Sequence, residues 1–173
     1  MEAYIGIGSN IEPEENILDA VGMLRSWSTR GMDVSPFYWT PPLHCPEQPP
    51  FLNGACRIET DVPPRDLKFR VLRSFETALG RIRTADRNAP RTIDLDILVY
   101  GDLVLDEPDL KIPDPDILDR PFLKVPLADL APHLVIPGLD LPLSSLLVSG
   151  AMVGMREAPG FSRRVRQQVA SPP

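Results

Sequence analysis

The chain has 173 residues, of which 43% are hydrophobic, so it can bury a core of its own. A net charge of −6 and a pI of about 4.9 argue against a general binding surface for nucleic acid or anionic membranes. The two cysteines and two histidines lack the spacing of a zinc site. No apolar stretch approaches the roughly 18 residues that are needed to span a bilayer.

These properties predict a cytoplasmic protein with reduced thiols, with neither a nucleic-acid nor a membrane partner. We expect a monomer or a weak homodimer. A single domain is expected over 1–150, followed at 151–173 by a C-terminal tail that is either mobile or a short helix.

Hydrophobic periodicity gives the first elements in chain order. Residues 3–8 predict a strand, and Pro13 opens a helix because proline is favoured in the first helical turn. Two more strands are predicted at 32–40 and 51–60. Pro64 opens a second helix, whose apolar stripe consists of Leu67, Val71, Leu72, Phe75 and Leu79.

The stretch RNAPRTIDLDIL at 87–98 carries most of the functional information. Its apolar residues predict a strand at 93–99, and a hairpin then returns through 110–112. The order βαββαβ is that of a ferredoxin-like α+β fold. We therefore expect an antiparallel sheet with helices on one face, followed by a C-terminal hairpin and a loop-rich extension.

Asp94 and Asp96 are separated by one residue on the predicted strand, so both carboxylates should point to the same face. Such a pair repels itself unless a cation lies nearby, and Mg²⁺ suits carboxylates that leave positions for water and phosphate oxygens. Arg87 and Arg91 would neutralise the phosphates. The pattern predicts a metal–triphosphate site. The alternatives are a solvated strand edge for the aspartates and a solvated loop for the arginine-rich stretch 81–91.

Two common nucleotide motifs are missing. The sequence has no GxxxxGK[ST] loop, so a P-loop does not hold the nucleotide. Gly6-Ile7-Gly8 begins like a dinucleotide fingerprint, but the third glycine position is Ile11. The dinucleotide-binding interpretation is therefore excluded.

The whole stretch at 87–98 resembles the signature of the 6-hydroxymethyl-7,8-dihydropterin pyrophosphokinase family. That signature runs basic, any, small, Pro, Arg, two free positions, Asp, aliphatic, Asp and two aliphatics. The resemblance covers about residues 2 to 147. Other similar segments are AYIGIGSN at 3–10, FYWTPPL at 37–43, QPPFLN at 48–53, LGRIR at 79–83 and DRPFLKVPLADLAPHLVIP at 119–137.

This resemblance implies transfer of pyrophosphate from ATP to 6-hydroxymethyl-7,8-dihydropterin in folate biosynthesis, with AMP as the second product. Asp94 and Asp96 would hold two Mg²⁺ ions on the triphosphate. The catalytic residues would be Arg81, Arg83, Arg91, Asp94 and Asp96. The residues that bind ATP would be Arg83, Arg87, Arg91, Ile97, Lys111 and Arg120.

The resemblance also implies a pocket for a flat aromatic pterin with a polar edge. Phe51 and Phe122 match the family's stacking pair, which would otherwise be assigned to the core. Asn53 would read the pterin edge. Thr40 and Leu43 would offer backbone groups from a Thr-Pro-Pro segment that by itself predicts only a rigid turn.

Asp114 stands where the family pattern has a histidine. Our hypothesis is that this carboxylate pairs with Lys111 or Arg120 and no longer contacts ATP. Two alternative functions remain at this point. The chain could be a catalytically weakened ferredoxin-like nucleotide-binding module, or a related transferase with a different acceptor.

Overall fold

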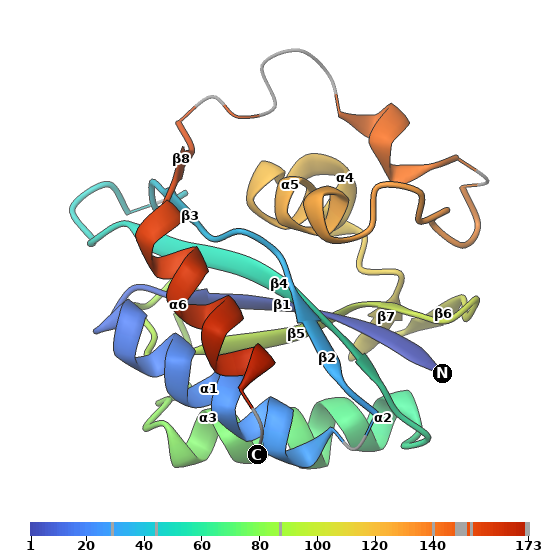
Figure 1. Ribbon diagram of the computed structural model, residues 1–173, viewed down its shortest axis with the longest axis horizontal. Helices are drawn as coiled ribbons and strands as arrows, with labels where there is room; N and C mark the ends of the chain where they lie inside the picture. Colours follow the sequence, from blue (N-terminus) through green and yellow to red (C-terminus); the bar gives the residue numbers. More distant parts are fainter. Residues whose placement is uncertain are drawn as a thin grey trace.

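The computed structural model of the protein describes residues 1–28, 30–43, 45–86, 88–139, 141–147, 152 and 154–171. Its centre is an antiparallel sheet in the order β5–β1–β4–β3–β8, and β2 also pairs with β4 (Figure 1). The order of β5, β1, β4 and the β2/β3 edge confirms the predicted ferredoxin-like topology. The strands are β1 (Glu2–Ser9), β2 (Met32–Val34), β3 (Tyr38–Thr40), β4 (Phe51–Glu59), β5 (Asp94–Tyr100) and β8 (Arg156–Glu157).

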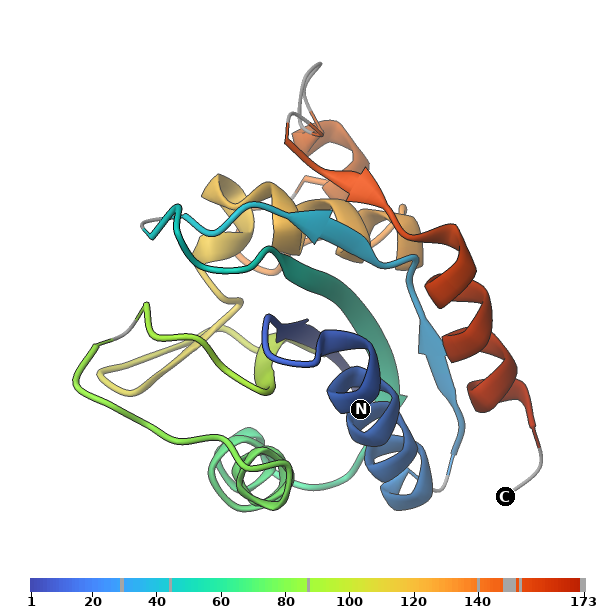
Figure 2. The same ribbon diagram turned by 90° about the vertical axis from the view of Figure 1, so that its left-hand side faces the viewer.

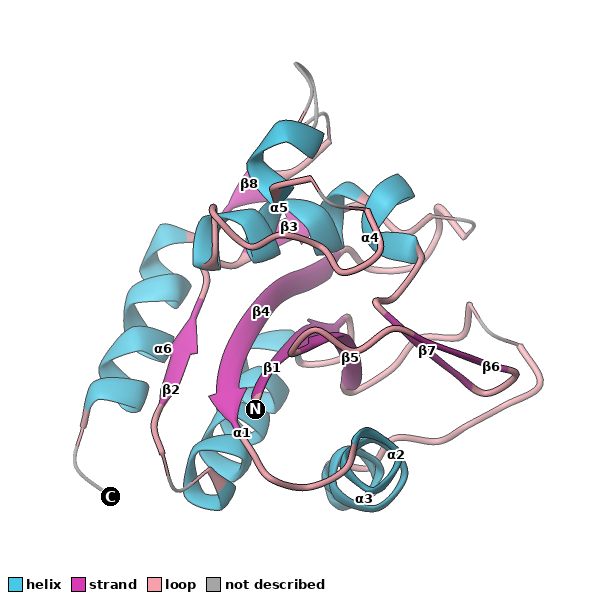
Figure 3. Cartoon of the chain, turned by 90° about the vertical axis from the view of Figure 1, so that its right-hand side faces the viewer, coloured by secondary structure: helices cyan, strands magenta, loops and turns pink. Residues whose placement is uncertain are grey.

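Two helical segments cover one face of the sheet (Figures 2 and 3). Helix α1 (Pro13–Trp27) begins at the predicted proline and buries an apolar stripe that includes Ile17 and Leu24. The second segment runs through α2 (Pro64–Asp66), the π-helical turn η1 (Leu67–Leu72) and α3 (Arg73–Ala78). Leu67 and Leu72 from this segment share the main core with Ile5, Ile7, Leu95 and Ile97 of the sheet.

The opposite face of the sheet is also covered, by helices that follow the predicted βαββαβ unit in the chain. Helices α4 (Asp116–Asp119) and α5 (Pro121–Leu130) lie over it, and Figure 1 shows them on the far side of the sheet from α1 and α3. Leu127 and Ala128 of α5 form a second core with Tyr4, Leu98 and Val99. The side chains of β1 and β5 therefore alternate between two cores and not between a core and solvent.

The strand predicted at 32–40 is interrupted, giving β2 and β3. Ser35 lies at the interruption and replaces the regular ladder with two other bonds. Its backbone N–H donates to Ala55 O at 2.9 Å, while its hydroxyl accepts from Ala55 N–H at 2.8 Å. Pro36, which follows, has no N–H to donate to a neighbouring strand.

The predicted hairpin after β5 consists of β6 (Leu105–Glu107) and β7 (Leu110–Ile112), which pair with each other as a separate small sheet. A short 3₁₀ helix, η2 (Leu143–Leu146), follows α5. The hairpin lies beside the outer end of β5, where it contributes to the wall of one of the cavities described below.

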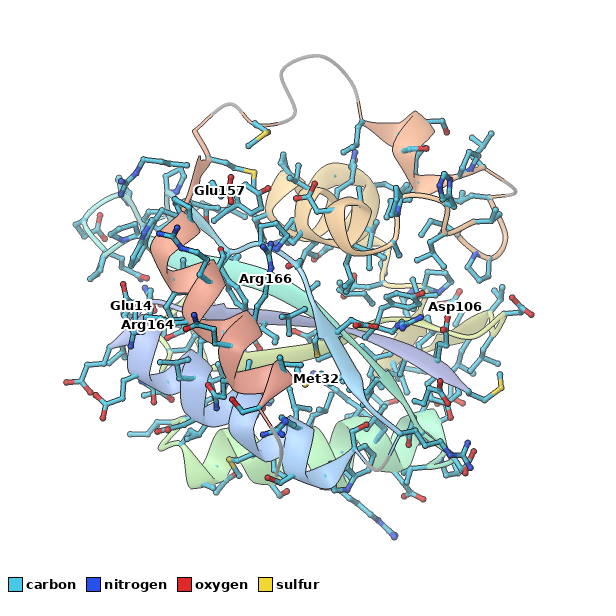
Figure 4. The ribbon with its side chains drawn as sticks, in the orientation of Figure 1. Glu14, Met32, Asp106, Glu157, Arg164 and Arg166 are labelled. Carbon is cyan, nitrogen blue, oxygen red and sulfur yellow. The ribbon has the colours of Figure 1, made fainter. Side chains whose placement is uncertain are left out.

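The C-terminal tail contains a helix, α6 (Pro159–Ala170), which packs against α1 and β2. Phe161 packs edge-on against the buried Phe37 with ring centroids 5.2 Å apart, and Ser162 Oγ accepts the Phe37 N–H at 2.9 Å. Arg164 reaches Glu14 of α1 at 2.7 Å (Figure 4). The tail was expected to be either mobile or a short helix, and its described part contains the helix α6. Phe161 and Val165 of this helix belong to the main core.

Candidate active site

A cavity of about 340 Å³ opens on the α5 face of the sheet, where the ends of β1, β4 and β5 meet. Gly8 forms part of its floor, and the missing side chain there is a geometric requirement. A Cβ atom at Gly8 would lie 2.6 Å from Oδ1 of Asn53, which is too close for any real contact. The glycine therefore leaves room for a polar side chain to enter the cavity from the neighbouring strand.

The two aspartates of β5 both line this cavity, as the alternation of the strand predicts. The side chain of Asp94 is 24% exposed and that of Asp96 is 44% exposed. Leu95, between them, points into the opposite core and is fully buried. Strand alternation thus predicted the correct relative direction of these three side chains.

Asp94 is held by two arginines from the segment before β5. Arg91 Nη1 lies 2.6 Å from Asp94 Oδ2, and Arg81 donates to Asp94 Oδ1. Burial opposes ionisation of this carboxyl, but the two guanidinium groups outweigh burial and hold the pKa of Asp94 below its usual value. Asp94 is therefore an anion at neutral pH.

Glu76 of α3 links Arg81 and Arg83 to the strand, and sequence reasoning missed it. Its side chain is 2% exposed. It accepts from Arg81 at 2.5 Å, from Arg83, and from the backbone N–H of Leu95 at 2.9 Å. The signal was a charged residue four positions after Leu72 in an otherwise apolar helical stripe. Burial of Arg81 works against its charge, but Asp94 and Glu76 raise its pKa.

Lys68 of the π-helical turn was also missed. Its side chain is 12% exposed, and its Nζ donates to Asp96 and to the backbone oxygen of Leu95, the latter at 2.7 Å. Lys68 and Glu76 thus bond the two backbone polar groups of Leu95 from the same helical segment. The signal in the sequence is again a charged residue on the apolar stripe of the helix, here four residues before Leu72.

A second cavity of about 250 Å³ lies on the other side of Asp96, against the β6–β7 hairpin. Ile97 and Lys111, which were predicted to contact the nucleotide, both line it, together with Lys68 and Asp114. Asp96 and Asp114 line both cavities. The two spaces therefore meet at these carboxylates.

The hypothesis that Asp114 pairs with Lys111 or Arg120 was wrong. Lys111 Nζ lies 2.7 Å from Asp106, and Arg120 Nε lies 2.9 Å from Asp116. Asp114 accepts instead from the backbone N–H of Asp116 at 2.9 Å. Burial, together with the charges of Asp96 and Asp116, raises the pKa of Asp114 to about 6. The hypothesis relied on proximity in the sequence, but in the structure Lys111 and Arg120 each lie closer to another carboxylate than to Asp114.

The remaining predicted cations have different positions. Arg120 lines the main cavity with its guanidinium 5.9 Å from the ring centre of Phe122. Arg83 is half exposed and faces Glu76, and neither Arg83 nor Arg81 lines the cavity in the described part of the chain. Arg87 lies outside the described residues.

The predicted pterin residues surround the other end of the main cavity, which all of them line. Asn53 is buried, and its Nδ2 donates to Thr40 Oγ1 at 2.7 Å, which leaves the Asn53 amide oxygen directed toward Gly8. Phe51 also has the guanidinium of Arg91 5.9 Å from its ring centre. The set consists of Thr40, Leu43, Phe51, Asn53 and Phe122.

Two polar residues that were not predicted fix the loop above this end of the cavity. Asn10 accepts the backbone N–H of Arg91 at 2.8 Å through its Oδ1, and Gln48 donates to the backbone oxygen of Asn88 at 2.9 Å. Cys45 is a free thiol on the cavity wall, and Cys56 is a free thiol in the core, where burial raises its pKa. His44, the residue before Cys45 in the sequence, lies outside the described residues.

Within the described residues, no three or more acidic, histidine or cysteine side chains are arranged to enclose a metal ion. A cation bound by the aspartate pair alone would have most of its coordination positions filled by other ligands. Across the same residues, no helix has the length and apolarity to cross a membrane.

Comparison with known proteins agrees with this geometry. Residues 4–132 match the family described as 7,8-dihydro-6-hydroxymethylpterin-pyrophosphokinase. The chain belongs to this family. The match runs from within β1 to the end of α5, and therefore contains both the aspartate pair and the segments that surround the main cavity.

Individual relatives support the assignment. The chain is 42% identical over 160 residues to the 2-amino-4-hydroxy-6-hydroxymethyldihydropteridine pyrophosphokinase of Pseudomonas aeruginosa, covering 91% of this chain and 96% of that protein. It is 38% identical to the protein of the same name from Haemophilus influenzae, covering 78% of this chain and 84% of that protein. A folic acid synthesis protein of Schizosaccharomyces pombe is 40% identical over 94% of this chain, which corresponds to 22% of that longer protein.

Proposed function

We propose that this chain catalyses the reaction for which its family is described. Pyrophosphate is transferred from ATP to 6-hydroxymethyl-7,8-dihydropterin in folate synthesis. The hydroxymethyl oxygen forms a bond to the β-phosphorus of ATP, and the bridge to the α-phosphorus breaks. The products are the pterin diphosphate and AMP, and we propose that the reaction depends on Mg²⁺.

One observation carries the proposal beyond family membership. Charged groups suited to a triphosphate and neutral groups suited to a pterin line a single cavity. Within it, Asn53 of β4 and Asp94 of β5 are the register partners of Gly8 on either side of β1. A pocket of several hundred Å³ is the size expected for small-molecule ligands. Two reactants held there would meet in one orientation, which is the main requirement for transfer between them.

The aspartate pair fits Mg²⁺ as a shared site. Asp94 is ionised, both carboxylates face the cavity, and hard oxygen donors of this kind are what Mg²⁺ accepts. Within the described chain no third such ligand joins the pair, so a cation there would take its other ligands from water and phosphate. When bound, two Mg²⁺ ions would neutralise the triphosphate and fix its geometry.

The arginines would divide into two roles. Arg91 and Arg120 line the cavity and would contact the phosphates directly. Arg81 is bonded to Glu76 and Asp94 and would position the aspartate. We propose that Arg83 and Arg87 contribute from the loop when the nucleotide is bound, as the resemblance implies.

The neutral end of the cavity would bind the pterin. Phe51 and Phe122 offer aromatic faces on the cavity wall, and Asn53 offers a fixed amide for the polar edge. Thr40 would hold that amide in orientation, and Leu43 would close the apolar side. The second cavity, which Ile97 and Lys111 line, would take the nucleoside part of ATP.

The test is formation of AMP from ATP by the purified chain. AMP should appear only when 6-hydroxymethyl-7,8-dihydropterin and Mg²⁺ are both present, in a one-to-one ratio with the pterin diphosphate. Chelation of Mg²⁺ should abolish it, and fresh Mg²⁺ should restore it. Binding of ATP without any AMP would indicate the nucleotide-binding module. AMP formed only with another hydroxyl acceptor would indicate the related transferase.

A further inference from the structure

Lys68 is an unusual element of the site because an ammonium group already occupies one of the two proposed metal carboxylates. Its Nζ contacts Asp96 and also donates to Leu95 O at 2.7 Å. The side chain is 12% exposed, so water screens this charge poorly. An ammonium and a divalent cation on the same carboxylate oxygen would repel each other strongly at this degree of burial.

Asp114 is a carboxylate without a cationic partner among the described residues, whereas Lys68 is a cation on a carboxylate that a metal ion would need. Asp114 lines both cavities, beside Asp96 and close to where a triphosphate would lie. Among the described residues, no lysine or arginine forms an ion pair with it, because Lys111 and Arg120 are engaged by Asp106 and Asp116. An uncompensated carboxylate at this position would repel the nucleotide.

Lys68 and Asp114 line the same 250 Å³ cavity as Asp96. The lysine side chain is long and flexible, and its three donors can rotate between partners while one remains on Leu95 O. Burial and the neighbouring carboxylates raise the pKa of Asp114, and the positive charge of Lys68 opposes that rise. Asp114 is thus a carboxylate that Lys68 can turn to when Asp96 is taken.

We infer that Lys68 is a positioning residue that exchanges carboxylates during nucleotide binding. It neutralises Asp96 when no nucleotide is bound and pairs with Asp114 when Mg²⁺ and the triphosphate take Asp96. The inference rests on the proposed function to the extent that it places a metal-bound nucleotide at the aspartate pair. It adds a residue, Lys68, that leaves Asp96 to the metal ion. It also explains why a carboxylate is compatible with nucleotide binding at the position of Asp114.

The experiment measures binding without pterin, so its result is independent of whether pyrophosphate is transferred. Affinity for α,β-methylene ATP, which cannot be cleaved between those phosphates, is determined by calorimetry in the presence of Mg²⁺. The variants are Lys68→Met, Asp114→Asn and the double variant. We expect Lys68→Met to weaken binding about tenfold when Asp114 is present. In the Asp114→Asn background, the same change should weaken it by no more than about threefold.

The matched control is Lys111→Met, which removes a positive charge from the wall of the same cavity. Because Lys111 pairs with Asp106, its effect should be the same in the parent and in the Asp114→Asn background. Equal losses from Lys68→Met in both backgrounds would overturn the exchange. If Lys68→Met does not fold, Lys68→Gln keeps a donor for Leu95 O without the charge and is tested in the same cycle.

A second measurement tests whether Lys68 competes with a metal ion for Asp96 when no nucleotide is bound. Without nucleotide, Mn²⁺ affinity measured by electron paramagnetic resonance should increase by about threefold or more in Lys68→Met, because no ammonium competes for Asp96. Unchanged or weaker Mn²⁺ binding would overturn the first half of the exchange. If pterin-dependent AMP formation failed while both binding results held, the proposed reaction would be wrong and the role of Lys68 would stand.

Discussion

The two ends of the main cavity are built on different physical principles. At the β5 end, Asp94 and Asp96 are neutralised by cations from the helical segment and loop that precede the strand. At the β3–β4 end, Asn53 and Thr40 form a neutral hydrogen bond beside aromatic walls. The charged end must exchange partners before it can bind a ligand, whereas the neutral end is already oriented.

This difference implies different responses to mutation. Changes in the charged end should alter catalysis, metal binding and pH dependence together, because its groups are coupled through shared charges. Changes in the neutral end should affect pterin affinity with little effect on the other quantities. The following predictions are ordered from the largest expected effect to the smallest.

The largest effect should come from the aspartate pair. Asp94→Ala or Asp96→Ala should reduce kcat more than about 100-fold at saturating Mg²⁺ while the fold is retained, because these groups would hold the metal ions. Steady-state assays of AMP formation and circular dichroism measure the two parts. The control is Asp33→Asn, an exposed aspartate paired with Arg57. Near-normal turnover in either alanine variant would refute the metal assignment.

Glu76 should show how strongly the charged end depends on one buried group. Glu76→Gln keeps an acceptor for Leu95 N–H but removes the charge between Arg81 and Arg83, so the free energy of unfolding should fall by about 3 kcal/mol. Urea unfolding measures it. The matched control, Glu14→Gln, breaks the exposed pair with Arg164 and should cost less than about 1 kcal/mol. Equal costs would mean that burial does not distinguish the two glutamates.

Asp114 should give the charged end a specific pH dependence. Burial and the neighbouring carboxylates raise its pKa from an ordinary 3.8 to about 6, so the folded protein binds this proton more tightly than the unfolded chain does. The ionised group therefore destabilises the fold above about pH 6, and this cost disappears as the pH falls toward about 4.

Asp114→Asn should consequently be more stable than the parent at pH 7, by about 2 kcal/mol at most, since the group is partly exposed. The advantage should shrink at pH 5. Paired urea unfolding curves at the two pH values measure the difference. An advantage that is the same at both values would exclude Asp114 as its source.

The smallest effect should come from the neutral end. Thr40→Val removes the acceptor that orients the Asn53 amide, so pterin affinity should fall about fivefold, with kcat nearly unchanged. Thr40→Ser keeps the hydroxyl and should restore affinity. Fluorescence titration with the pterin measures both. A loss of kcat that exceeded the loss of affinity would show that the two ends are not separable in this way.

The sequence predicted those features that depend on local pattern. The direction of Asp94 and Asp96 follows from strand alternation, and the start of α1 follows from Pro13. The contacts of Lys68 and Glu76 with Leu95 could not be predicted, because they depend on how a helix with a π turn lies against the sheet edge. The partners of Lys111 and Arg120 depend on competition among several nearby carboxylates, which sequence distance does not decide.

The bonds around Leu95 also have a consequence for association between molecules. β5 is the edge strand of the sheet, and such an edge can pair with a strand from another chain. Here Glu76 takes the Leu95 N–H, Lys68 takes the Leu95 oxygen, and the backbone N–H of Asp114 takes the Leu98 oxygen at 2.8 Å. Lys68, which also contacts Asp96, and Glu76, which also bonds Arg81, therefore cap this stretch of the edge together with the Asp114 N–H and oppose strand-to-strand aggregation there.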